Sequence, residues 1–155
     1  MENDKLINSN EMIKKYMVMS MGAGLIPIPV IDIVALTGIQ LKMLNNLTEI
    51  YQVPFSKNAS KSIIGSLVGG LAPTYAAAGI GGSLAKLIPV SGTITGMMTM
   101  SSFSGASTYA IGQVFIQHFE SGGTLLDFDI DKMQEYFMTA FKQGKEQTKK
   151  DIPSE

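Results

Sequence analysis

The hydrophobic positions of the chain recur mainly at helical spacing. The clearest case runs from Val30 to Tyr51, where apolar residues return every three or four positions and polar residues collect elsewhere on the helical wheel. The apolar positions of this segment are Ile33, Leu36, Met43, Leu44, Leu47 and Ile50. No segment alternates with period two over more than a few residues. The pattern therefore predicts an all-α chain, a helical bundle of five or six helices in one domain, residues 1–155.

Proline and polar capping residues set the predicted helix boundaries. A first helix is expected from about Glu11 to Gly22, with Ser9 or Asn10 as its cap, because the prolines that follow Leu25 interrupt the pattern. Pro29 suits the first turn of the second helix. Further along, Ser56 is placed to cap a third helix.

Two long stretches without formal charge follow the third predicted cap. They run from Ser62 to Ala85 and from Leu87 to Phe119, and glycine, alanine, serine and threonine dominate both. We expect a long, small-residue-rich apolar helical hairpin with arms near residues 62–85 and 90–119, ended by glycines 122 and 123. The prediction thus places the hairpin in the middle of the chain.

A last, amphipathic helix is predicted over about residues 128–150. Asp127 or Asp129 is placed to cap it, and lysines border its apolar stripe. The stripe consists of Ile130, Met133, Phe137, Ala140 and Phe141. We expect this helix to dock on the surface of the bundle.

Small residues recur four positions apart in the charge-free stretches. That spacing puts them on one helix face and lets two backbones approach closely. The positions are Gly65, Gly69, Gly92, Gly96, Ser104, Thr108 and Gly112. We expect these faces to pack against partner helices, in the same chain or in a second copy, and we predict a homo-oligomer.

The charges are balanced in number but uneven in position. The chain has 12 basic and 13 acidic side chains, all the basic ones being lysine, and a net charge of −1. Only six lie between Tyr16 and Phe119, and these are Asp32, Lys42, Glu49, Lys57, Lys61 and Lys86. This composition offers no electrostatic footprint for nucleic acid. The absence of cysteine excludes disulfides and thiol chemistry.

The charge-free stretches leave two alternatives open for the hairpin. Runs of 24 and 33 residues would span ~36 Å and ~50 Å as helices, longer than the ~30 Å hydrocarbon layer. Their length favours a membrane hairpin with both termini in the cytoplasm, and the N-terminus lacks the pattern of a secretory signal. The alternative is a soluble cytoplasmic homo-oligomer, because small residues lower the hydropathy of both runs.

Two polar residues share the apolar face of the second helix. Asp32 and Gln40 lie within about 100° of Leu36 and Leu47 on the helical wheel. Burial of Gln40 without a partner would cost roughly 1–3 kcal/mol. We therefore expect Asp32 and Gln40 to belong to a buried polar network at a helix crossing, or to a docking site for a partner.

The same segment carries a family resemblance. The proline-rich turn, the face of the second helix, the third cap and a later proline turn after a glycine-rich stretch occur together between about Met12 and Glu120. These positions are Ile26, Pro27, Ile28, Pro29, Asp32, Ile33, Ala35, Leu36, Gln40, Met43, Leu47, Tyr51, Ser56, Lys86, Leu87, Ile88, Pro89 and Gly92. Residues 12–120 resemble the YcjF-type domain of unknown function, which is found attached to Era-like GTPase domains and in bacterial inner-membrane proteins.

The resemblance implies a bacterial, membrane-associated helical module that works beside a GTPase, and it implies no known activity. With it, we expect the protein at the inner membrane, on its cytoplasmic side, and the alternative is the cytoplasm. The sequence contains no GTPase domain, so we expect any GTPase partner to be another chain. We expect no enzyme, no cofactor and no metal.

Three chemical motifs are incomplete. The stretch from Gly81 to Lys86 has Ala85 where a phosphate loop needs its second glycine. The acids at 127, 129 and 131 begin like a calcium loop, but Lys132 stands at the glycine position. His118, the only histidine, has one nearby acid, Glu120, and no nucleophile in view. We therefore expect capping or structural roles for these residues.

Overall fold

The computed structural model describes residues 2–25, 29–71 and 94–151, apart from the side chains at 29–33, 94–99 and 151. This part of the chain contains five α-helices and no strand, which confirms the all-α prediction. The helices are α1 (Glu2–Ala23), α2 (Pro29–Tyr51), α3 (Lys57–Gly69), α6 (Ile94–Glu120) and α7 (Ile130–Asp151).

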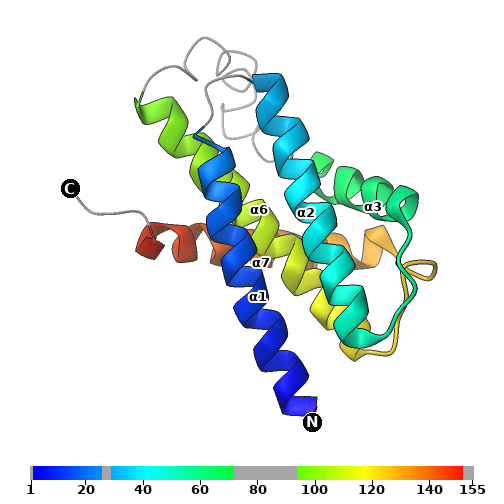
Figure 1. The fold of residues 1–155 in the computed structure, drawn as a ribbon. Coiled ribbons are helices and arrows are strands. Elements are labelled where there is room, and N and C mark those ends of the chain that lie inside the picture. The colour runs from blue at the N-terminus through cyan, green and yellow to red at the C-terminus, as the bar shows by residue number, and fades with distance from the viewer. Residues whose placement is uncertain (1, 26–28, 72–93, 152–155) are drawn as a thin grey trace.

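The long helix α6 is the centre of the bundle. It packs mainly against α1 and α7, and α2 completes the packing beside α1. Figure 1 shows α1 and α2 side by side in front of α6, with α7 crossing behind and α3 near α2. The side chains that lie wholly inside include Ile13, Met43, Leu44, Leu47, Leu67, Ile111, Val114, Phe115 and Phe137. The core is therefore shared by every described helix.

Local capping rules account for several helix ends. The side chain of Ser56 accepts a hydrogen bond from the backbone N–H of Ala59 at 3.3 Å, which confirms it as the cap of α3. The carboxylate of Asp129 accepts a bond from the backbone N–H of Lys132 at 3.2 Å at the start of α7. Gly122 has a φ of 84° in the turn after α6, a conformation that favours glycine.

The predicted start of the first helix is wrong. α1 begins at Glu2, and Ser9 and Asn10 lie inside it instead of capping it. Glu2 and Asp4 occupy the first turn, where acidic groups favour the positive end of the helix dipole. Asn10 accepts a hydrogen bond from Gln113 of α6 at 2.8 Å, so tertiary contact uses a residue that resembles a cap. By contrast, the predicted bounds of α2 and α7 hold to within two residues.

The predicted helical hairpin is only partly described. The second arm corresponds to α6, whereas the described part of the first arm is α3, which ends at Gly69. Residues 72–93 lie outside the described part, and with them the segment between the two predicted arms. Among the described residues, no helix has both the length and the apolar character needed to cross a membrane.

Candidate functional site

A buried polar layer joins the three helices α1, α2 and α6. The side-chain amide of Gln40 donates hydrogen bonds to Ser107 Oγ at 3.2 Å and to Thr108 Oγ1 at 3.1 Å. The hydroxyl of Thr108 also shares a hydrogen bond of 2.7 Å with Ser20 of α1. All four side chains are at most 2% exposed. Ser20, Gln40, Ser107 and Thr108 are called the polar layer below.

Further polar contacts continue along α6 in both directions. Ser101 Oγ donates to the backbone carbonyl of Met21 at 2.8 Å, and Ser102 shares a 3.1 Å hydrogen bond with Thr148 of α7. Toward the other end, Gln113 bonds to α1 as described above. The helix α6 thus holds α1, α2 and α7 through side-chain hydroxyl and amide groups as well as through apolar packing.

The chemical groups of the polar layer are suited to holding helices α1, α2 and α6 in place. Its groups are neutral hydroxyls and one amide, and Ser107 also donates to the carbonyl of Ser104 at 3.0 Å. A buried polar group that is hydrogen-bonded costs little, whereas an unpaired one costs about 1–3 kcal/mol. The layer therefore links α1, α2 and α6 and disfavours arrangements of these helices that would leave its groups unpaired.

Small residues bring the helices close at the same contacts. A Cβ atom added to Gly112 would lie 2.6 Å from the side chain of Ile13 in α1. One added to Gly105 would lie 2.6 Å from Met21 and 2.8 Å from Thr148. Since real Cβ contacts are longer than about 3 Å, α1 and α7 occupy the space that larger residues on α6 would need.

The structure separates the predicted packing residues into three groups. Ser104, Thr108 and Gly112 are buried in α6, and two of them touch α1. Gly65 and Gly69 lie on the exposed side of α3, and an added Cβ would meet nothing within 4 Å. They make no close helix contact with the described residues, so contact with a second copy stays a prediction. Gly92, the surroundings of Gly96 and the side chain of Asp32 lie outside the described part.

Sequence reasoning missed several residues of this site. Ser20, Gly24, Gly105 and Ser107 all take part in the contacts of α6, yet none was predicted. Strict four-residue spacing drifts by about 40° per step around a helix of 3.6 residues per turn. Spacings that alternate between four and three, as in Ser101, Gly105, Thr108 and Gly112, would have identified the face toward α1.

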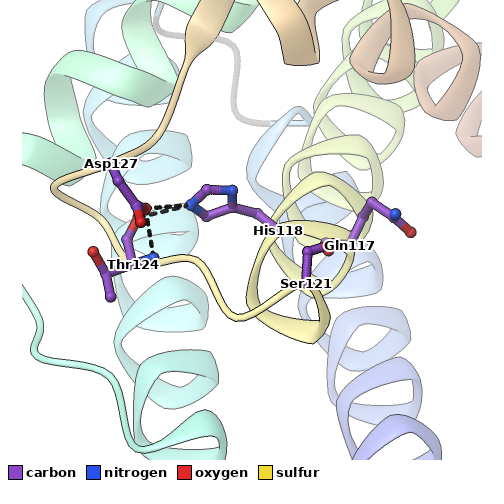
Figure 2. Close-up of polar contacts among 5 residues, drawn as sticks. All are labelled: Gln117, His118, Ser121, Thr124 and Asp127. Atoms are coloured by element: carbon purple, nitrogen blue, oxygen red, sulfur yellow. Dashed lines mark hydrogen bonds and ion pairs between the residues drawn. The ribbon is translucent and has the colours of Figure 1, made fainter.

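The loop between α6 and α7 forms a second polar cluster, shown in Figure 2. His118 Nε2 lies 2.7 Å from the carbonyl oxygen of Thr124 and 3.0 Å from the carboxylate of Asp127. Because that carbonyl can only accept, Nε2 carries the proton. The same carboxylate accepts a 2.7 Å bond from the backbone N–H of Thr124. The histidine ring also covers Gly123, so this cluster holds the loop in place.

The titration of Asp127 provides a test of this loop. The backbone N–H of Thr124, and to a lesser extent His118, lower the pKa of Asp127. A lowered folded-state pKa stabilises the protein above the unfolded-state value of about 3.9 and loses that effect as pH falls through the folded value. We expect Asp127→Asn to lower stability at pH 6 by more than at about pH 3, measured by urea denaturation. Equal effects at both values would contradict the role of the carboxylate.

Other ionisable groups in the described part are paired or solvated. Burial, followed by a 2.6 Å hydrogen bond to Glu120, raises the pKa of Tyr51 to about 12, so its phenol stays protonated at neutral pH. Within the described ranges, no group of three or more His, Asp or Glu side chains is arranged to hold a metal ion. Two of the three acids that resemble a calcium loop have local roles, Asp127 in the loop cluster and Asp129 as the helix cap.

Comparison with known proteins identifies a family and a relative that this chain resembles. The family profile "Domain of unknown function (DUF697)" matches residues 4–146. A protein of Magnetospirillum gryphiswaldense named magnetosome membrane protein 22 is 39% identical over 137 residues, which cover 88% of this chain and 70% of that protein. No solved structure matches the chain.

Proposed function

Because the chain belongs to the DUF697 family of domains of unknown function, we propose that it is a membrane-associated helical module that binds other proteins and catalyses no reaction. The family match covers most of the chain and confirms the YcjF-type resemblance. The observation that carries the membrane part of the proposal is the 39% identity to a protein named as a magnetosome membrane protein.

The composition of the buried site supports binding over catalysis. Its serine, threonine and glutamine side chains are hydrogen-bonded to one another or to backbone carbonyls. General acid and base catalysis needs a titratable group within reach of a substrate. The polar layer instead contributes neutral groups that hold three helices in one arrangement, as a rigid binding module requires.

Fractionation of the native host tests the membrane part of the proposal. The protein is expected to sediment with the membranes, and a carbonate wash then separates peripheral attachment from insertion. Recovery of the protein in the soluble fraction before any wash would favour the second candidate, a soluble cytoplasmic homo-oligomeric scaffold. The exposed glycines of α3 are the observation that supports this alternative.

The proposal also includes self-association of the chain through α3. Gly65 and Gly69 lie one helical turn apart on the exposed side of α3, a spacing that lets a second helix approach closely. Because each added side chain points into open space within the chain, Gly65→Leu and Gly69→Leu are expected to leave the fold intact.

Sedimentation velocity measures the effect of these two substitutions. We expect wild type to sediment as an oligomer and Gly65→Leu to shift toward monomer, with at least tenfold weaker association. Gly38→Leu, which adds the same bulk at an exposed glycine of α2, is the matched control. An unchanged oligomer in both glycine variants would contradict self-association through α3.

A GTPase supplied by another chain is the partner class that we propose. The support is the family resemblance, since YcjF-type domains occur attached to Era-like GTPase domains. Chemical cross-linking in the native host, followed by mass spectrometry, is expected to recover a GTPase of this class. Cross-links that consistently exclude such proteins would contradict this part of the proposal.

A further inference from the structure

The last turns of α1 and of α7 lie next to each other on the bundle. The side chains of Met21 and Thr148 both converge on Gly105 of α6, within 3 Å of the position that a Cβ would take. In Figure 1, α7 passes behind α1 and its C-terminal end emerges on the side of α1 away from α2. This side of the molecule therefore combines residues from two distant parts of the sequence.

Apolar side chains on α1 remain exposed at this junction. Val18 is 52% exposed, and Leu25, just beyond the end of α1, is 48% exposed. Lys14 and Val18 are spaced at i and i+4, so both lie on one side of α1, and Leu25 follows in the turn after the helix. Lys14 and Val18 lie within about 60° of Met21 on the helical wheel, and the Met21 side chain lies against Gly105 of α6 beside Thr148 of α7.

Lysines dominate the charge around these apolar groups. Lys145, Lys149 and Lys150 are exposed in the last turns of α7, and Lys149 pairs with Glu146 at 3.1 Å. Glu11, seven residues before Val18, lies on the same side of α1 and is an exposed acid of this region. Lys14, Val18, Leu25, Lys145, Lys149 and Lys150 are called the basic apolar face below.

We propose that the basic apolar face is the surface by which the protein lies on an anionic lipid membrane. The proposal rests on the membrane association proposed above and names the face and the lipid chemistry. Lysine side chains bury their apolar stems and keep the ammonium groups in the headgroup region. Exposed valine and leucine side chains between such lysines can enter the acyl boundary.

The charge of this face decides between lipid classes. An anionic leaflet attracts each nearby lysine, whereas a zwitterionic leaflet offers no net attraction. Four lysines accompany two carboxylates, Glu11 and Glu146, and Glu146 is itself paired with Lys149 and 70% exposed. The apolar area is small, so the electrostatic contribution is needed for stable attachment.

Vesicle sedimentation with the purified full chain tests the proposal. The vesicles contain phosphatidylcholine alone or phosphatidylcholine mixed with phosphatidylglycerol. Wild type is expected to bind the mixed vesicles, to be released by high salt and to bind phosphatidylcholine weakly. The variant with Lys145→Gln, Lys149→Gln and Lys150→Gln is expected to bind the mixed vesicles roughly 100-fold more weakly.

Two further variants separate the contribution of the apolar side chains to vesicle binding from a general effect of surface substitution. Val18→Ser combined with Leu25→Ser is expected to weaken binding at least tenfold, because both side chains are exposed and are not needed for the core. The matched control combines Val34→Ser and Lys132→Gln, which remove an exposed valine on α2 and a lysine at the other end of α7. This control is expected to bind as wild type does.

The result that overturns this proposal differs from the one that overturns membrane association. Two results would contradict the role of the basic apolar face. One is that wild type binds both kinds of vesicle equally, and the other is that the triple lysine variant binds mixed vesicles as well as wild type does. If wild type sediments with host membranes while either of these results holds, the face is wrong and the proposed function stands. Absence of wild type from host membranes instead contradicts the proposed function.

Discussion

Gly24→Ala is expected to lower the free energy of unfolding by about 2–3 kcal/mol. A Cβ atom at this position would lie 2.7 Å from Ser101 Cα and 2.8 Å from the carbonyl oxygen of Met100. Both atoms belong to the backbone of α6, so no side-chain rotation can relieve the overlap. To accommodate the methyl group, the end of α1 must move away from α6 and weaken the 2.8 Å bond between Ser101 and Met21.

The neighbouring glycine provides the matched control for this substitution. Gly22 lies in the last turn of α1, and an added Cβ would meet nothing within 4 Å. Gly22→Ala is therefore expected to stabilise the protein by about 0.5 kcal/mol through helix propensity. Urea denaturation at neutral pH measures both values. Equal stability of the two alanine variants would contradict the close approach of α1 to α6.

Gln40→Glu is expected to destabilise the protein by roughly 3–5 kcal/mol at pH 7. Gln40 is 2% exposed and its amide donates to two hydroxyl groups, so the substitution buries a carboxylate whose partners in the described part of the chain are hydroxyl groups and not a cation. Burial raises the pKa of such a carboxyl above its unfolded-state value of about 4.3. The destabilisation is thus largest above the folded-state pKa and fades as pH falls below about 4.

Two comparisons make the Gln40 result specific. Gln143→Glu changes an exposed residue of α7 in the same way and is expected to alter stability by less than about 0.5 kcal/mol. Gln40→Leu is expected to cost only about 1–2 kcal/mol, because Thr108 keeps Ser20 as a partner and Ser107 keeps the carbonyl of Ser104. A pH-independent loss in Gln40→Glu would show that the polar layer is not closed to water.

Local sequence signals predicted the parts of the fold that depend on neighbouring residues. The apolar periodicity from Val30 to Tyr51 gave the bounds of α2 to within one residue, and the capping roles of Ser56 and Asp129 follow from bonds three residues along the chain. The burial of Gln40 also followed, because its helix face is otherwise apolar.

The partners of these residues could not be predicted in the same way. Gln40 bonds to residues 67 and 68 positions away, and Ser20 meets Thr108 across 88 positions. Serine and threonine occur throughout the charge-free stretches, so composition cannot select which hydroxyl lies opposite. Glycine spacing has the same limit: Gly112 packs against α1, whereas Gly65 with similar spacing lies in the open.

The polar layer and the basic apolar face have different roles in this account. The layer sets how α1, α2 and α6 meet, and α6 in turn carries α7 through the contact between Ser102 and Thr148. The proposed membrane surface needs α1 and α7 side by side. A substitution such as Gly24→Ala is therefore expected to affect the lipid-facing surface only through the arrangement of the helices.

The location of the intact chain in living cells of its native host tests the central claim most directly. A fluorescent protein joined to the N-terminal end leaves the proposed face free, because α1 begins at the end of the bundle away from its last turns (Figure 1). The expected result is fluorescence concentrated at a membrane. Uniform fluorescence throughout the cytoplasm, with the fusion shown to be intact and folded, would contradict the account.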